Sequence, residues 1–109
     1  MKLMTKAIEN KIPALYETEE AKTHRVYAKF FHPFSNWTWY AVEYDAEQGM
    51  FFGLVDGHEM ELGYFTLAEL ESIKIGGLGI ERDLHWNDKT TTEELQMEKN
   101  DQKKMSIAF

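Results

Sequence analysis

The 109-residue sequence contains no cysteine, which excludes disulfide frameworks and metal sites built from thiolates. It has no run approaching the roughly 20 apolar residues that a membrane-spanning helix requires. Its first residues also lack the apolar stretch of a signal peptide. These absences predict a soluble, cytoplasmic protein with no membrane partner.

Basic residues are missing from the centre of the chain. Between Phe30 and Ile73 there is no lysine or arginine, whereas eight acidic residues and eleven of the fifteen aromatic residues lie there. Nucleic-acid affinity depends on cations that displace the counterions of the phosphate backbone. The charge pattern therefore predicts no nucleic-acid partner, and it leaves open a basic protein, a cation or a neutral ligand.

Apolar periodicity and helix breakers predict the order of the elements. Thr5 is expected to cap a short helix that Pro13 ends. Thr66 and Glu69 have the spacing of a capping box, and they predict a second helix. Strands are expected at residues 25–32, 34–45, 50–54, 58–65 and 80–86. This order predicts an α+β fold, in which short helices pack on one face of an antiparallel four- to five-stranded meander sheet.

Residues 1–87 are expected to form this single α+β domain. The composition then becomes polar, and residues 88–109 are expected to form a C-terminal extension that is either a short helix or disordered. Thr91 and Glu94 are spaced to cap such a helix.

Strict alternation in the strand at residues 34–45 places Trp37, Trp39 and Ala41 on one face and Val42 and Tyr44 on the other. In the following hairpin, a three-residue loop at residues 55–57 would leave one face apolar and buried. The expected pairs are Leu54 with His58, Phe52 with Met60, and Met50 with Leu62. Glu59 and Glu61 would then share the other face with Phe51 and Gly53.

Five sequence blocks resemble a small bacterial domain-of-unknown-function family (number 2958), over roughly residues 3–86. The blocks are Phe34-Ser-Asn-Trp-Thr-Trp-Tyr40, Phe51-Phe-Gly-Leu-Val55, Glu61-Leu-Gly-Tyr-Phe65, Leu67-Ala-Glu-Leu-Glu71 and Ile80-Glu-Arg-Asp-Leu84. The resemblance implies carriage on plasmids, phages and other mobile elements. It implies no activity and supplies no catalytic or ligand residues.

The two neighbouring tryptophans are either sheet core or anchors of a protein contact, for which tryptophan is favoured. The candidate binding residues are Asn36, Trp37, Trp39, Glu43, Glu59, Glu61, Arg82 and Asp83.

The acidic residues also allow two chemical alternatives, a metal site and a catalytic site. His58 with Glu59 and Glu61, or His85 with Asp83 and Glu81, have the residue types of a metal site. Glu43, Glu61, Glu81 and Asp83 would serve general acid–base catalysis if their strands were neighbours.

No catalytic motif is present, and no catalytic residue, metal or cofactor is expected. The sequence favours a non-enzymatic protein-binding accessory protein of a mobile element, with a protein partner or a second copy of the chain as its ligand. One alternative is an acidic DNA mimic that inhibits a host restriction or defence protein. The other alternative is a small hydrolase that depends on carboxylates and histidine.

Overall fold

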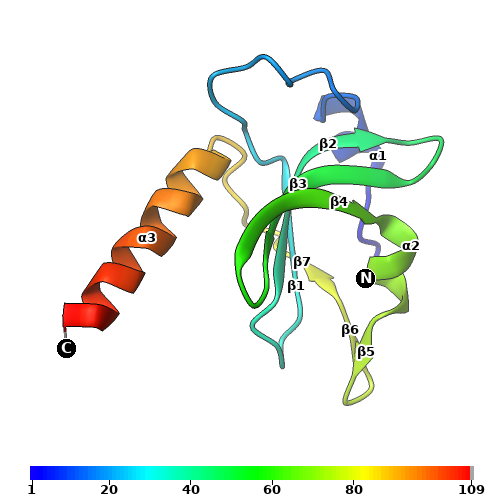
Figure 1. Cartoon of the computed structure of the whole chain (residues 1–109). Coiled ribbons are helices and arrows are strands. Elements are labelled where there is room, and N and C mark those ends of the chain that lie inside the picture. Colours follow the sequence, from blue (N-terminus) through cyan, green and yellow to red (C-terminus); the bar gives the residue numbers. More distant parts are fainter. Residues whose placement is uncertain (109) are drawn as a thin grey trace.

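The computed structural model describes residues 1–108 of the chain and the side chains of residues 1–105. Five antiparallel strands form the main sheet in the order β4-β3-β2-β1-β7, and β5 and β6 form a separate hairpin (Figure 1). The predicted α+β fold with an antiparallel sheet and short helices is confirmed. The elements are α1 (Lys6–Lys11), β1 (Ala28–Phe31), β2 (Thr38–Asp45), β3 (Met50–Asp56), β4 (Met60–Thr66), α2 (Leu67–Ser72), β5 (Lys74–Ile75), β6 (Leu78–Gly79), β7 (Glu81–Arg82) and α3 (Thr92–Ala108).

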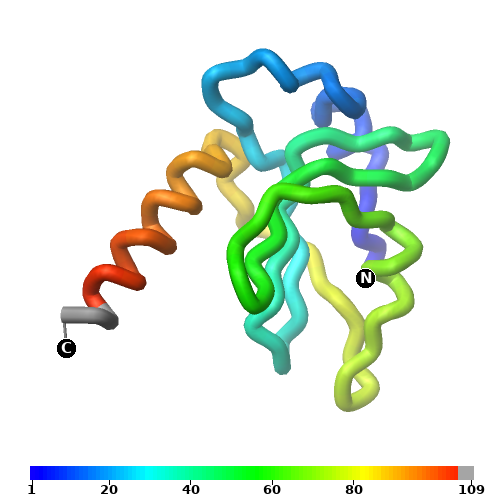
Figure 2. The backbone as a smooth tube through the Cα atoms, in the orientation of Figure 1, coloured from blue at the N-terminus to red at the C-terminus, as the bar shows by residue number. Residues whose placement is uncertain are grey.

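The larger core lies on one side of the sheet, which we call the core face and define by Phe30, Trp39, Phe51 and Phe65. The Phe51 ring centroid lies 5.5 Å from that of Phe30 and 5.1 Å from that of Phe65. The segment before α1 lies alongside α2, and both cover this face (Figure 2). Leu70 of α2 is almost fully buried there. Burial of these large aromatic rings contributes apolar area that stabilises the fold.

Local sequence signals place the two short helices. The Thr5 side chain accepts a hydrogen bond from the Ile8 N–H at 3.2 Å, and α1 ends before Pro13. The Thr66 side chain accepts from the Glu69 N–H at 3.0 Å, and its hydroxyl donates to the Glu69 carboxylate. Both predicted helix starts are therefore confirmed.

The opposite side of the sheet, which we call the open face, carries Tyr40, Val42, Phe52, Leu62 and Tyr64. Its buried cluster is smaller and is partly covered by Trp86 and by Leu95 of α3. Helix α3 extends away from the sheet (Figure 1). One further contact links the two, because the Lys99 ammonium of α3 pairs with the carboxylate of Asp56 at the end of β3, at 3.3 Å. Within residues 1–108, no helix is long and apolar enough to cross a membrane.

A β-bulge in β2 changes which side chains reach each face. Ala41 pairs with Gly53, but Glu43 pairs with Phe52, so Val42 is an extra residue in β2. Val42 and Glu43 consequently both belong to the open face, and Tyr44 lies on the core face with its ring 4.4 Å from Phe51. The expected placement of Tyr44 beside Val42 is wrong because strict alternation cannot anticipate a bulge.

The register predicted for the β3–β4 hairpin is also wrong, by four residues. Leu54 pairs with Leu62, Phe52 with Tyr64 and Met50 with Thr66, because β3 continues through Asp56 and the turn lies at residues 57–59. A register shift by an even number of residues leaves each strand residue on its expected face. The expected burial is different, however, because the face with Leu62 was predicted to be buried and Leu62 is 52% exposed. The helices cover the other face, which carries Phe51.

Candidate functional site

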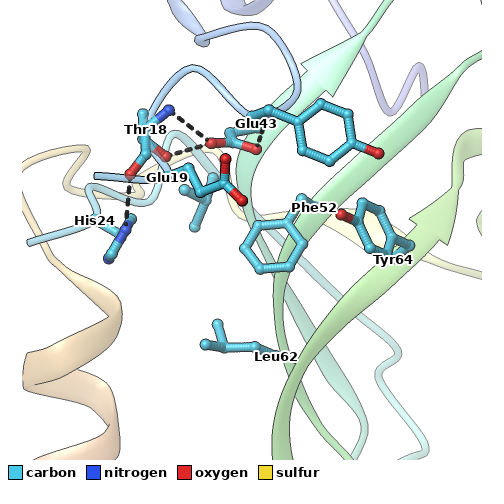
Figure 3. Close-up of a pocket in the computed structure, with 9 residues that line it drawn as sticks. Thr18, Glu19, His24, Glu43, Phe52, Leu62 and Tyr64 are labelled. Carbon is cyan, nitrogen blue, oxygen red and sulfur yellow. Dashed lines mark hydrogen bonds between the residues drawn. The ribbon is translucent and has the colours of Figure 1, made fainter. Parts of the chain in front are cut away.

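A pocket of about 330 Å³ lies on the open face, between side chains of β2, β3 and β4 and residues 14–24, which we call the crossing segment. Its apolar wall consists of Val42, Phe52, Leu62 and Tyr64 from the three strands. Polar groups from the crossing segment and from the bulge lie opposite this wall (Figure 3). A pocket with an apolar wall and a few convergent polar groups is the usual form of a ligand site.

Glu43 provides the central polar group of this pocket and is only 3% exposed. Its Oε1 accepts a hydrogen bond from the Tyr16 N–H at 2.8 Å, and its Oε2 accepts one from the Thr18 N–H at 2.9 Å. The Thr18 hydroxyl donates a third hydrogen bond to Oε2 (Figure 3). Among the described side chains, no lysine or arginine forms an ion pair with Glu43. The carboxylate therefore holds the crossing segment in place without a cationic partner.

Tyr16 has an unusual backbone conformation, with a φ angle of 70° in the left-handed region. Residues other than glycine adopt this region at a cost, and such strain is frequent at functional sites. The conformation accompanies the two N–H groups that bind Glu43, and it leaves the Tyr16 ring exposed, with its centroid 6.4 Å from that of Tyr64. The neighbouring Tyr16 side chain raises the pKa of Tyr64.

His24 connects the pocket wall to the start of α3. Its Nε2 lies 3.0 Å from the Thr18 carbonyl oxygen, and its Nδ1 lies 2.9 Å from Oε2 of Glu93. Both neighbours are acceptors, so an imidazolium with two N–H groups satisfies them together. Partial burial raises the pKa of Glu93, but hydrogen bonds from His24 and Thr92 outweigh it, so that the pKa is lowered overall.

The predicted binding residues on the core face form one group. Trp39 is buried at 9% exposure and lies in one row with Val55 and Glu61 across the sheet. Trp37 is 38% exposed, and its ring lies 6.0 Å from that of Trp39 and 5.5 Å from that of His58 in the β3–β4 turn. Asn36 and Glu59 are exposed, and they adjoin Trp37 and His58 in the chain at this end of the sheet.

Arg82, Asp83 and Glu43 do not join that group. Strand β7, which contains Arg82, lies at the sheet edge opposite β4. The Arg82 guanidinium donates to the carbonyl oxygens of Lys2 and Leu3, at 2.6 and 2.8 Å, and holds the N-terminal segment. Asp83 accepts from the His85 N–H at 2.9 Å. Both side chains have structural contacts, and Glu43 lies on the other face of the sheet.

The pocket residues from the crossing segment and from β4 were absent from the sequence-based candidates. They are Tyr16, Thr18, Glu19, His24, Leu62 and Tyr64. One signal was present in the sequence, because Glu43 is an isolated acid inside an otherwise uncharged strand from Thr38 to Tyr44. Among the residues that the structure describes, no group of three or more His, Asp or Glu side chains is arranged to hold a metal ion.

A family model matches residues 3–104, which include the pocket, the sheet and most of α3. The family is described as Protein of unknown function (DUF2958). The chain belongs to this family. No curated protein and no solved structure matches this DUF2958 chain.

Proposed function

We propose that this DUF2958 protein is a non-enzymatic protein-binding module that contacts its partner through the open face beside β4. The observation that carries the proposal is the pair of exposed apolar residues on β4. Leu62 and Tyr64 are each 52% exposed, and both line the pocket. Apolar side chains that gather on an exposed surface beside a pocket are typical of interaction sites.

The position of β4 supports the same proposal. It is a seven-residue strand at the edge of the sheet, and it contains no lysine or proline, which commonly protect edge strands. In the described chain, no segment other than β3 forms backbone hydrogen bonds with residues 60–65. An extended segment of a partner can pair with such an edge and place alternate side chains over the open face.

The charge distribution favours a basic partner. The stretch from Phe30 to Ile73 contains no lysine or arginine, and Glu59 and Glu61 are exposed beside the free edge. This acidic surface would attract a basic partner and accelerate its association. It would repel acidic proteins, nucleic acids and anionic membranes. The proposal therefore includes a protein partner, and the family resemblance adds a mobile-element accessory role in the cytoplasm.

The pocket chemistry supports binding over hydrolysis. A general base needs a free acceptor within reach of the substrate proton. His24 lacks such an acceptor, because both of its ring nitrogens have partners. The DNA-mimic alternative needs a row of free carboxylates, and no observation specifically favours it, since Asp56 pairs with Lys99 and Glu43 is buried.

Site-specific photo-crosslinking in the producing cell tests the proposal. A photoreactive phenylalanine analogue at position 64 should yield a defined protein adduct, because Tyr64 lies in the proposed contact. The same analogue at Ala46, which is exposed in the β2–β3 turn, is the matched control. An adduct at position 64 that is lost in a Leu62→Asp background supports the contact. Equal adducts at both positions, or no adduct at position 64, would reject it.

A further inference from the structure

We infer that the pocket around Glu43 binds a cationic group on an apolar stem, namely the ammonium of a lysine or the guanidinium of an arginine from the partner. This inference rests on the proposed function for the source of the group. The pocket chemistry itself can be tested without the partner. Three features of the pocket support the inference: a buried carboxylate that has no lysine or arginine partner among the described side chains, several aromatic rings and an apolar wall.

The first feature is the charge of the pocket. Glu43 is buried, and among the described side chains no lysine or arginine pairs with it. An ionised carboxylate has about four acceptor sites, and the three described hydrogen bonds leave roughly one of them for a ligand. Because charges attract each other more strongly in a buried site than in water, a cation that reaches Glu43 is attracted more strongly than it would be at the surface.

The other charged groups at the pocket strengthen this preference. Glu19 is exposed and lines the pocket near Phe52, so it adds a second negative charge where a ligand would enter (Figure 3). His24 is the basic side chain in the lining, and the Glu93 carboxylate, 2.9 Å from its Nδ1, offsets a positive charge on the ring. An anionic ligand would meet two carboxylates without a free cation, which excludes phosphates and acidic side chains.

The second feature is the set of aromatic rings. Phe52 and Tyr64 have centroids 5.1 Å apart with their planes inclined at 58°, and Tyr16 is inclined at 58° to Tyr64. Inclined rings present their negative faces from more than one direction, which is the arrangement that attracts an alkylated or guanidinium cation. Leu62 and Val42 supply apolar surface for the methylene stem of the same side chain.

The volume is consistent with a single side chain. The pocket measures about 330 Å³, at the lower end of the range of roughly 300–1,000 Å³ for ligand sites. It also adjoins β4, which carries Leu62 and Tyr64. A partner strand paired with this edge would therefore have side chains within reach of the pocket. This adjacency favours a partner side chain over a free amine as the occupant.

Titration of the full-length protein with simple probes, followed by amide NMR, tests the inference. n-Butylammonium chloride should perturb the amide signals of Tyr16, Thr18 and Tyr64. Its affinity should exceed that of the neutral isostere n-butanol by about fivefold or more, which corresponds to about 1 kcal/mol of attraction to Glu43 and the aromatic rings acting together. Sodium chloride at equal ionic strength controls for screening. Equal binding of the amine and the alcohol would overturn the inference.

Variants separate the role of each group. Glu43→Gln should abolish the preference for the amine, and Glu19→Gln should reduce it about twofold to fivefold, whereas Glu47→Gln in the β2–β3 turn has the same charge change and should have no effect. If Glu43→Gln fails to fold, Tyr64→Leu provides the second test, because it removes an exposed ring and should bring the amine to the level of the alcohol. Unchanged preference in both Glu19→Gln and Tyr64→Leu would reject the assignment.

A final comparison identifies the source of the cation. An extended, capped pentapeptide with a central lysine should bind at least tenfold more tightly than n-butylammonium, and it should also perturb the amides of β4. Equal affinities would overturn the assignment to a partner side chain and indicate a free amine. A peptide with norleucine in place of lysine is the matched control. Failure of all cationic probes together with a crosslink at position 64 would reject the inference and leave the proposed function supported.

Discussion

Glu93 binds His24 through both of its carboxylate oxygens, although the two residues are 69 positions apart in the sequence. Oε1 accepts from the His24 backbone N–H at 2.8 Å, and Oε2 lies 2.9 Å from the ring Nδ1. The His24 carbonyl oxygen in turn accepts from the N–H of Thr92, which is 1% exposed. The first turn of α3 is therefore fixed to the segment that forms the pocket wall. A substitution of Glu93 should alter the position of Thr18, because His24 contacts both residues.

This contact predicts an acid-dependent loss of stability. Because the pKa of Glu93 is lowered from its usual 4.5 in the folded protein, its ionised form stabilises the fold above that value. The contribution is lost as the pH falls through the folded pKa. Glu93→Gln should therefore destabilise the protein at about pH 5.5 by about 1 kcal/mol or less, since the side chain is 41% exposed and solvent screens the pair.

Urea denaturation of the wild type and of Glu93→Gln between about pH 3 and pH 5.5 checks this prediction. The difference in unfolding free energy should shrink below about pH 4.5. Glu98→Gln, an exposed substitution further along α3, is the charge-matched control. A constant difference across this pH range would show that the ionised carboxylate does not stabilise the fold.

Two paired glycines should respond differently to the same substitution. Gly53 of β3 and Gly63 of β4 are direct partners in the sheet. A Cβ at Gly53 would lie 1.9 Å from the Tyr40 carbonyl oxygen, whereas a Cβ at Gly63 meets nothing within 4 Å. Gly53→Ala should therefore cost about 3 kcal/mol or more, because backbone must move, and Gly63→Ala should change stability by about 0.5 kcal/mol or less.

Thermal or urea unfolding of the two alanine variants, measured side by side, gives the answer directly. Equal stabilities would contradict the backbone geometry at the β2 bulge, where Gly53 faces Ala41. A destabilised Gly63→Ala would indicate instead that the core face beside Gly63 is covered in solution.

The helix cap at Thr66 makes a quantitative prediction of its own. Thr66→Ala removes the acceptor of the Glu69 N–H and should destabilise the protein by about 1 kcal/mol. Thr66→Ser keeps the hydroxyl oxygen and should retain most of this stability. Urea denaturation midpoints of the three proteins test this prediction. Identical midpoints for the wild type and the alanine variant would mean that the cap does not contribute to the stability of the fold.

Sequence reasoning identified the two short helices and the strands of the main sheet, but neither the β5–β6 hairpin nor the pocket, for physical reasons that particular residues illustrate. The capping signals at Thr5 and Thr66 involve atoms three residues apart, so the sequence alone predicts them. The Glu43 site depends on the bulge at Val42 and on the left-handed backbone of Tyr16, and neither has a residue type that demands it. Contacts from Glu43 to Thr18 span 25 positions, and they arise only once the sheet has formed.

The hairpin register shows a related limit. Alternation determines which face a residue joins, but registers that differ by an even number of residues satisfy the same pattern. The observed pairing of Val55 with both Trp39 and Glu61 keeps β3 in the sheet through Asp56, whereas the loop was expected at residues 55–57. Tertiary pairing with β2 thus outweighs the local turn preference at Val55 and Asp56.

We predict that the surface around Trp37, on the core face, mediates self-association or binds a partner. Trp37 is 38% exposed and Trp39 only 9%, so Trp37 is the one of the two that can anchor a contact. Its ring lies over Gly57 and against His58, and removing it should cost about 1 kcal/mol of packing without unfolding the sheet. Sedimentation velocity at high protein concentration should show association of the wild type that Trp37→Ala abolishes. Phe34→Ala removes another exposed aromatic ring and should leave association unchanged. A wild type that is monomeric at every concentration, with no partner affected by Trp37→Ala, would show that this surface is not a binding site.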